Sequence, residues 1–188
     1  MAIEKLRILA ISGSVRSGSF NRGLLQAAKA LDLPDVEIEI YDGIAELPIF
    51  SEELEGANRP AAAIELDEAV RNADAVLIAT PEYNGSLPGG LKNLLDWGSR
   101  PYANGAFIKK PTAVIGASAG QYGAARAVKA TAEIVTHMGA SVLDGHLTVG
   151  GAHGKFDSNG TLQDEMTLKS IEEIVVRLGE HARVGVTA

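Results

Sequence analysis

The fold is decided by a stretch that joins a buried strand to an amphipathic helix: Arg7-Ile8-Leu9-Ala10-Ile11-Ser12-Gly13-Ser14-Val15-Arg16-Ser17-Gly18-Ser19-Phe20-Asn21. Residues 7–12 are mostly apolar and partly β-branched, the pattern of a strand that is buried on both faces. Small and hydroxyl-bearing residues follow, and the next apolar residues recur with helical spacing, at Phe20, Leu24, Ala28 and Leu31. This order of strand, loop and helix indicates the first part of a parallel α/β sheet.

The same alternation continues along the chain. Further strand candidates are residues 36–41, 75–80, 112–117 and 141–149, and helical patterns lie between them and after the last one. Because parallel strands need helix-length connections, we expect a doubly wound α/β fold, with helices on both faces of a five-stranded parallel sheet. The whole chain, residues 1–188, is expected to form one domain.

One of these strands has a different pattern. In residues 36–41, Glu37 and Glu39 alternate with apolar residues, whereas the other candidates are continuously apolar. Alternation of this kind is typical of a strand with one solvated side. We therefore expect residues 36–41 at an edge of the sheet.

Composition and charge exclude several classes of function. Seventeen Lys and Arg against 24 Asp and Glu give a net charge of −7, and no basic block is present, so no nucleic-acid partner is expected. The absence of cysteine excludes disulfides, thiolate metal sites and cysteine nucleophiles, and we expect no metal site. No apolar run reaches membrane-spanning length and no secretory signal can be drawn, so we expect a cytoplasmic protein without a membrane span.

Ligands of such sheets bind beyond the carboxyl ends of the strands, which directs attention to three loops. The first, residues 13–19, combines hydroxyl groups, Arg16 and the free amides at the start of a helix, and this combination suits a dianionic phosphate. It lacks the Lys of a Walker A loop, and Val15 stands where the dinucleotide fingerprint needs glycine. The alternative is a plain polar loop in which Ser17 or Ser19 caps the helix.

The second loop follows residues 75–80 and precedes a helix whose first turn Pro88 suits. It is rich in proline, glycine and other small residues, which let backbone N–H and C=O groups approach a flat ligand closely. The alternative is that Asn84 and Gly85 form an ordinary turn.

The third loop carries Gly116, Ser118 and Gly120, the spacing of the nucleophile elbow in α/β hydrolases. Asp144 and then His146 or His153 follow in the order of a serine triad. However, no oxyanion loop and no correctly placed base can be identified, and a hydrolase leaves the first two loops unexplained. A serine hydrolase using Ser118 is therefore the weaker alternative.

Two motifs together resemble the NADPH-dependent FMN reductase family, which includes bacterial quinone, azo-dye and chromate reductases. They are Gly13-Ser14-x-Arg16-x-x-Ser19-x-Asn21 and Pro81-Glu82-Tyr83-Asn84-Gly85-Ser86-x-Pro88-Gly89-x-Leu91-Lys92-Asn93-x-x-Asp96-Trp97. The resemblance covers nearly the whole chain, and the second motif is long and specific. It implies a flavodoxin-like fold with strand order 2-1-3-4-5, non-covalently bound FMN, and a homodimer or homotetramer.

The resemblance also implies which residues would bind the cofactor. The FMN phosphate and ribityl chain would be held by Ser14, Arg16, Ser19, Phe20 and Asn21. The edge of the isoalloxazine would be wrapped by Pro81, Glu82, Tyr83, Asn84 and Gly85. The flavin would be lined, with a weaker match to the family, by Ser118, Gly120 and Gly123.

The expected activity follows from that cofactor. NADPH or NADH would reduce the flavin by hydride transfer, and a small-molecule acceptor (a quinone, an azo compound, a free flavin or a metal oxyanion) would then take two electrons at the same face, in ping-pong order. No side chain would act as catalytic acid or base, because the flavin carries the hydride. The non-enzymatic alternative is a flavodoxin-type electron carrier, which would bind FMN without turning over NAD(P)H.

One feature outside the loops bears on assembly. The helical pattern after residues 75–80 has more apolar surface than one sheet face need cover. Its large apolar residues are Leu87, Leu91, Leu94, Leu95 and Trp97. We therefore expect this helix to leave apolar surface for a second subunit, with the flavin sites at or near the subunit interface.

Overall fold

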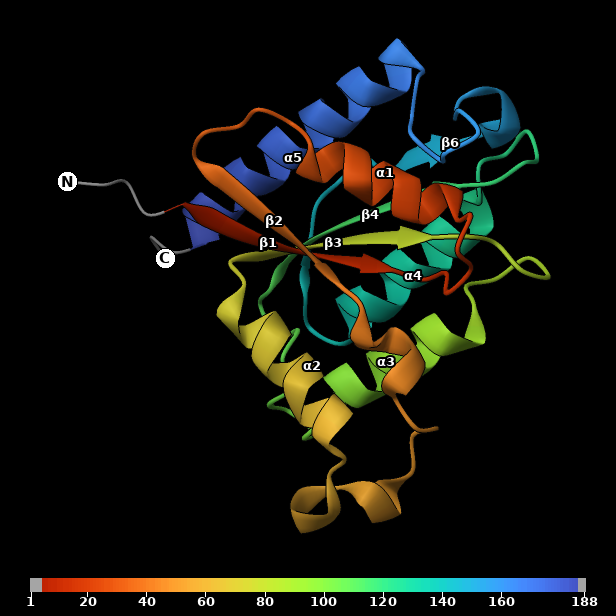
Figure 1. Cartoon of the computed structure of the whole chain (residues 1–188). Helices are drawn as coiled ribbons and strands as arrows, with labels where there is room; N and C mark the ends of the chain where they lie inside the picture. Colours follow the sequence, from red (N-terminus) through yellow and green to blue (C-terminus); the bar gives the residue numbers. More distant parts are fainter. Residues whose placement is uncertain (1–4, 186–188) are drawn as a thin grey trace.

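The structure, a computed structural model, describes residues 5–185 and consists of a central sheet between two layers of helices (Figure 1). The strands are β1 (Leu6–Ser12), β2 (Val36–Tyr41), β3 (Ala75–Thr80), β4 (Pro111–Ala117), β5 (Ser141–Val142) and β6 (Leu147–Val149). Their order is β2-β1-β3-β4-β5, β6 also pairs with β4, and every pairing is parallel. The expected flavodoxin-like strand order is confirmed.

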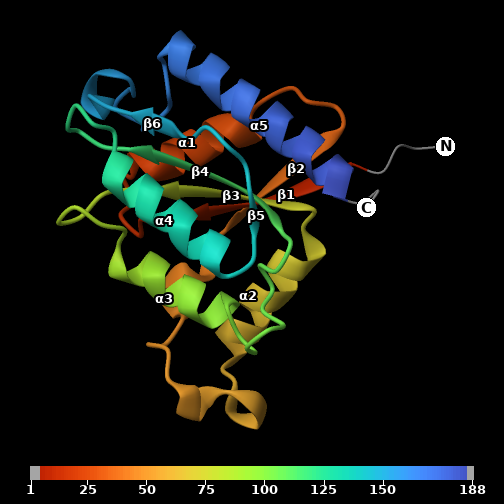
Figure 2. The ribbon, with the colours of Figure 1, turned by 180° about the vertical axis from the view of Figure 1, so that it is seen from behind.

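The helices are α1 (Phe20–Lys29), α2 (Ala61–Asn72), α3 (Gly89–Gly98), α4 (Ala125–His137) and α5 (Glu165–Gly185). Helices α1 and α5 cover one face of the sheet, and α2, α3 and α4 cover the other (Figures 1 and 2). Two separate hydrophobic clusters result, one on each face, and β1, β3 and β4 contribute alternate side chains to both. None of the helices within residues 5–185 is long and apolar enough to cross a membrane.

Strand β2 lies at the edge of the sheet, as its alternating sequence predicts. It pairs only with β1, and both Glu37 and Glu39 are exposed whereas Ile38 is buried. The connection that follows it runs through short 3-10 turns, Gly43–Glu46, Glu52–Leu54 and Gly56–Asn58, before α2 begins.

The prediction of one continuous strand over residues 141–149 is wrong. β5 pairs with the start of β4 and β6 with its end, and the chain leaves the sheet between them. Gly145 has a φ of 81°, a left-handed conformation that no extended strand can contain, and the Asp144 carbonyl turns away to accept a hydrogen bond from Arg177 Nη2 at 2.6 Å. The apolar character of Leu143 and Leu147 hides this interruption in the sequence.

The expectation that α3 leaves apolar surface uncovered is also wrong. Leu91, Leu94, Leu95 and Trp97 are all fully buried within this single chain. One side of the helix packs on the sheet, and the connection after β2 covers another, because Trp97 Nε1 donates to the Pro48 carbonyl at 2.8 Å. These apolar side chains of α3 are therefore buried in the protein's own core.

The two ends of the described chain lie on the same side of the molecule, opposite the carboxyl ends of the strands (Figure 1). Helix α5 runs back along the sheet, so that Gly179 packs against the side chain of Leu6 at the start of β1. The loops at the carboxyl ends of the strands are therefore remote from both ends of the chain.

Candidate functional site

The loops after β1, β3, β4 and β6 meet at one edge of the sheet, where all the parallel strands end (Figure 1). They are residues 13–19, 81–88, 118–124 and 150–154. In open parallel sheets this edge is where ligands bind, next to the point at which strand order reverses. Here that point lies between β1 and β3, so the loops after these two strands flank it.

The loop after β1 presents hydrogen-bond donors that the protein leaves free. Within residues 5–185, the backbone N–H groups of Ser17 and Gly18 donate no hydrogen bond. The guanidinium of Arg16 lies across the loop, 3.1 Å from the position that a Cβ on Gly18 would take, and 5.6 Å from the centre of the Phe20 ring. A side chain at residue 18 would therefore push the cation off the loop.

Helix α1 begins directly behind these donors. Ser19 is its N-cap, and the Ser19 hydroxyl accepts a hydrogen bond from the Arg22 N–H at 3.3 Å. The positive end of the helix dipole thus points into the loop. Free amides, a guanidinium and a helix N-terminus in one place are the groups that suit a phosphate dianion.

Asn21 lies in the same motif but is directed into the protein. It is 2% exposed, its Nδ2 donates to the Ala117 carbonyl at 3.0 Å, and its Oδ1 accepts from the Ala117 N–H at 2.8 Å. Both ends of the side-chain amide are occupied by one residue at the end of β4. Asn21 therefore ties α1 to the strand that carries the loop 118–124.

Phe20 is likewise packed against the protein. Its ring lies 5.1 Å from that of His153, edge to face, and 5.2 Å from that of Phe156. These contacts hold the segment after β6 against the start of α1, with Arg16 above the same ring.

In the loop after β3, Glu82 also contacts another element of the protein. Its carboxylate accepts hydrogen bonds from the backbone N–H groups of Arg126 at 3.0 Å and Ala127 at 3.4 Å. Helix α4 has no side-chain cap from its own N-cap residue, Ala124. Glu82 supplies that cap from a distant part of the sequence, and so joins the loop after β3 to the loop after β4.

The next residues form a tight hairpin. Tyr83 and Ser86 exchange two backbone hydrogen bonds, of 3.0 and 3.1 Å, around Asn84 and Gly85. Both central residues have positive φ, 53° and 77°, which Asn and Gly adopt at least cost. The turn projects from the edge and leaves the Tyr83 side chain 51% exposed, while Pro81 is buried behind it.

The sequence did not indicate Arg126 as a site residue, yet the structure places it at this site. Its guanidinium Nη1 lies 3.6 Å, and its side-chain Cδ 3.9 Å, from the position that a Cβ on Gly85 would take. The side chain thus lies against the 84–85 turn from the start of α4. Its position immediately after the third small-residue loop is the only sequence signal that could have indicated it.

The loop after β4 packs closely on the segment after β6. Gly123 has a φ of 57°, and a Cβ there would lie 2.5 Å from the Val149 nitrogen, so no other residue fits without displacement. Gly120 has room for a Cβ, which would meet only Ser118 Oγ at 3.7 Å. Close packing therefore explains Gly123, whereas Gly120 leaves open space at the edge.

No serine triad is assembled around Ser118. Its hydroxyl donates to the Gly120 carbonyl at 3.2 Å, and among residues 5–185 it makes no hydrogen bond with a histidine. His153 packs against Phe20, and the Asp144 carbonyl is bound by Arg177 on α5. The geometry gives the hydrolase alternative no support.

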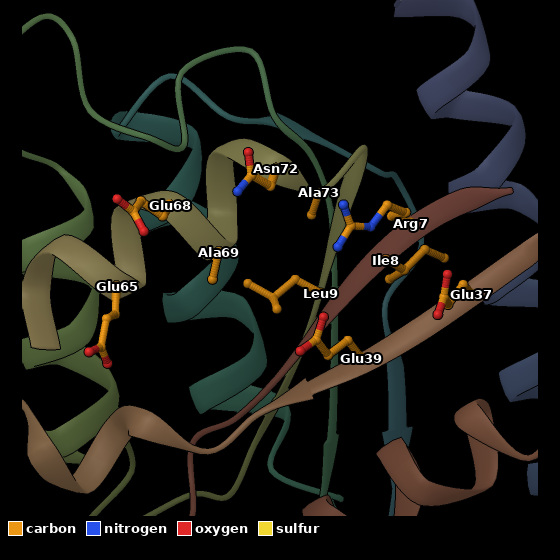
Figure 3. Close-up of a pocket in the computed structure, with 10 residues that line it drawn as sticks. All are labelled: Arg7, Ile8, Leu9, Glu37, Glu39, Glu65, Glu68, Ala69, Asn72 and Ala73. Atoms are coloured by element: carbon orange, nitrogen blue, oxygen red, sulfur yellow. The ribbon is translucent and has the colours of Figure 1, made fainter. Parts of the chain in front are cut away.

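Two hollows near β1 differ sharply in charge. One, of about 320 Å³, lies beside the 13–19 loop and is lined by Ser14, Arg16, Ser17 and Arg22 among others. The other, of about 290 Å³, lies at the amino-terminal half of β1 and β2 beneath α2, and Figure 3 shows Glu37, Glu39, Glu65 and Glu68 around it with Arg7. An excess of carboxylates repels phosphate, so only the first hollow suits an anionic ligand. No group of three or more residues that could hold a metal ion occurs in the described part of the chain.

The fold and this site define a flavodoxin-like α/β protein whose loop after the first strand carries free donors suited to a phosphate. The family model for NADPH-dependent FMN reductases matches residues 6–154. The chain belongs to this family.

Similar proteins agree with that assignment. A curated NAD(P)H-dependent FMN reductase of Pseudomonas aeruginosa is 39% identical over 171 residues, 90% of this chain and 91% of the relative. A quinone reductase of Pseudomonas putida is 36% identical over 159 residues, 84% of this chain and 85% of the relative. Among solved structures, the flavoenzyme NAD(P)H:acceptor oxidoreductase FerB of Paracoccus denitrificans has a TM-score of 0.86 and 30% identity, and the match covers 96% of this chain and 98% of that one.

Proposed function

We propose that this protein is an FMN-dependent oxidoreductase that takes electrons from NADPH or NADH and passes them to a quinone. Family membership and the names of the relatives support this proposal. The observation that carries it is the 13–19 loop, with its free amides, its guanidinium and the helix α1 behind it. A cytoplasmic location, expected from the sequence, stays a prediction.

The residues at the edge of the sheet fit FMN. The phosphate would be held by the backbone of Ser17 and Gly18, by Arg16 and by the Ser14 and Ser19 hydroxyls, with charge-assisted hydrogen bonds as the main contribution. The backbone from Pro81 to Gly85 would lie along the flavin ring, and the open space at Gly120 would leave room beside it. We assign Asn21, Phe20 and Glu82 a supporting role, since their side chains already contact the protein.

When bound, FMN supplies the two-electron redox chemistry, and the protein supplies position and electrostatics. Backbone N–H groups in the loops after β3 and β4 are proposed to face the pyrimidine end of the ring and to stabilise negative charge that develops there, as oxyanion holes do. The Glu82 bridge to α4 would keep these two loops at a constant separation during turnover. No side chain is assigned a catalytic proton transfer.

We propose that donor and quinone bind in turn at one open face. The loops after β1 and β3 would cover the other face, so a stacked nicotinamide excludes a flat quinone from the same place. Other acceptors, including azo compounds, free flavins and metal oxyanions, would enter by the same route. Initial rates against NADPH at several fixed quinone concentrations should give parallel double-reciprocal lines, whereas intersecting lines would contradict a shared site.

The assignment of FMN itself is tested by an absorption spectrum of the purified protein and by titration of the apoprotein with FMN. A flavin spectrum, or uptake of about one FMN per chain, is expected. Oxidation of NADPH in the presence of a quinone then separates an enzyme from a flavodoxin-type carrier. A protein that neither contains nor takes up FMN would contradict the proposed function.

We further propose a homodimer or homotetramer, formed through a groove beside α3 and not through the buried leucines of α3 itself. An apolar groove of about 780 Å³ runs between α3 and α4, and its partly exposed apolar residues include Leu87, Ile134 and Met138. It begins at Ser86 and Leu87, directly after the turn that flanks the candidate site. A second copy of the chain seated there would lie beside the flavin.

A further inference from the structure

Arg126 is a cation without an anionic partner at the rim of the candidate site. Among residues 5–185, its guanidinium makes no ion pair, whereas Lys129, one turn further along α4, lies 3.9 Å from Glu133. Arg22, the cation nearest to Arg16 in the sequence, is paired with Asp42. Among the described residues, Arg16 and Arg126 are thus two guanidinium groups at this edge that have no carboxylate partner, in a chain with a net charge of −7.

The backbone of Arg126 is held in place while its side chain remains solvent-accessible. Its N–H group donates to the Glu82 carboxylate at 3.0 Å, which fixes the start of α4 against the loop after β3. The side chain then lies beside Gly85, with Nη1 3.6 Å from the position that a Cβ on Gly85 would take. Since Glu82 already occupies the first amides of α4, the guanidinium is the group at this position that is free to bind an anion.

We infer that Arg126 binds a phosphate of the nicotinamide donor and thereby sets the affinity of the enzyme for that substrate. The inference rests on the proposed function, because it requires a nicotinamide nucleotide on the open face of the site. Arg16 and the 13–19 loop would be engaged by the FMN phosphate, so a second phosphate-bearing ligand needs a second cation. A guanidinium offers paired N–H donors that match phosphate oxygens.

The donor carries phosphate at two places that Arg126 can contact. The diphosphate is present in both NADH and NADPH, and the 2′-phosphate is present only in NADPH. The test therefore uses the unreactive oxidised nucleotides, NADP⁺ and NAD⁺, titrated into the FMN-loaded protein by calorimetry. Wild type is compared with Arg126→Ala, Arg126→Lys and the matched control Lys129→Ala, which removes an exposed cation from the same helix.

We expect Arg126→Ala to weaken nucleotide binding by about 5- to 30-fold, because the contact is charge-assisted but exposed to solvent. Arg126→Lys should restore part of the affinity, and Lys129→Ala should leave it unchanged. If Arg126→Ala loses affinity for NADP⁺ alone, Arg126 binds the 2′-phosphate. If it loses affinity for NADP⁺ and NAD⁺ equally, Arg126 binds the diphosphate. In steady state the KM for the donor should rise while the KM for the quinone stays constant.

Results that contradict the role of Arg126 can be distinguished from results that contradict the proposed function. If wild type binds FMN and NADP⁺ but Arg126→Ala binds them equally well, or if Lys129→Ala causes the same loss, the inference is overturned and the proposed function stands. A change confined to the KM for the quinone would also overturn it. If wild type takes up no FMN, both the inference and the proposed function fail.

Discussion

Asn21 and Glu82 belong to the two motifs that indicate a flavin site, yet both side chains are bonded to the protein's own backbone. Asn21 joins α1 to the end of β4, and Glu82 joins the loop after β3 to α4. The motifs therefore contain two kinds of residue, those that face the ligand edge and those that hold the loops together. Sequence alone cannot separate them, because an amide or a carboxylate serves either purpose.

We assign Arg16 to the residues that face the ligand edge, because its guanidinium lies over the free amides of the 13–19 loop. We expect Arg16→Ala to raise the dissociation constant for FMN by roughly 10- to 150-fold, since a hydrogen bond to a charged group contributes about 1.5 to 3 kcal/mol. Fluorescence titration of apoprotein with FMN measures this. Arg7→Ala is the matched control, because it removes the same charge from the opposite end of β1. Equal affinity of wild type and Arg16→Ala would remove Arg16 from the site.

Asn21 is one of the residues that hold the loops together, and this role is tested by the stability of the apoprotein. Asn21→Ala should lower the free energy of unfolding by about 1 to 3 kcal/mol, because it leaves the buried N–H and C=O of Ala117 without partners. Urea denaturation without FMN measures it, with the exposed Asn58→Ala as control. An unchanged apoprotein with weaker FMN binding would instead mean that Asn21 acts on the ligand.

Ser118 separates the reductase from the hydrolase. Ser118→Ala should retain most NADPH:quinone activity, because the hydroxyl only donates to the Gly120 carbonyl. A hydrolase nucleophile would lose several orders of magnitude on the same change. Turnover is measured on protein with verified FMN content, and total loss of activity with FMN bound would contradict the role assigned to this loop.

At the scale of elements, the first four strands were predictable to within one residue of each boundary. The continuous apolar runs of β1, β3 and β4 predict buried strands, and the alternation of Glu37 and Glu39 with apolar residues marks β2 as an edge. The fifth predicted strand, residues 141–149, was wrong, because it is divided into β5 and β6. This division depends on one left-handed glycine, Gly145, and on Arg177 from a distant helix. The contact between Trp97 and Pro48 also could not be predicted from the sequence, because Pro48 lies in the irregular connection after β2, which has no periodic pattern.

The start of α5 predicts a specific response to acid. Asp164 accepts hydrogen bonds from Lys155 Nζ at 2.7 Å and from the Thr167 hydroxyl and N–H, and these hydrogen bonds lower its pKa from 3.8 to about 2. A carboxyl whose pKa is lower in the folded state stabilises the fold above its ordinary pKa, and this contribution is lost as pH falls from about 4 to about 2.

We therefore expect Asp164→Asn to reduce stability at neutral pH and to flatten the decline of the melting temperature below about pH 4. Glu172→Gln, on the exposed side of the same helix, serves as control. Parallel melting curves for wild type and Asp164→Asn across this pH range would contradict the assignment.

At the scale of the whole molecule, the groove between α3 and α4 makes a prediction about assembly. Ala130 lines it, and Ala130→Glu places a charge there without removing a core side chain. We expect wild type to sediment as a dimer or tetramer at micromolar concentration and Ala130→Glu to shift toward monomer. Met166→Glu, which adds the same charge at an exposed position on α5, should not. A wild type that is monomeric and fully active would contradict the proposed assembly.

The position of the chain ends has a practical consequence. Both ends of the described chain lie on the side of the sheet away from the candidate site, and α5 returns beside the start of β1. A fusion partner, an affinity handle or an electrode linker attached at either end would therefore leave the candidate site facing outward. The same proximity suits a circular permutant in which a short peptide joins the two ends and a new opening is cut in an exposed loop elsewhere.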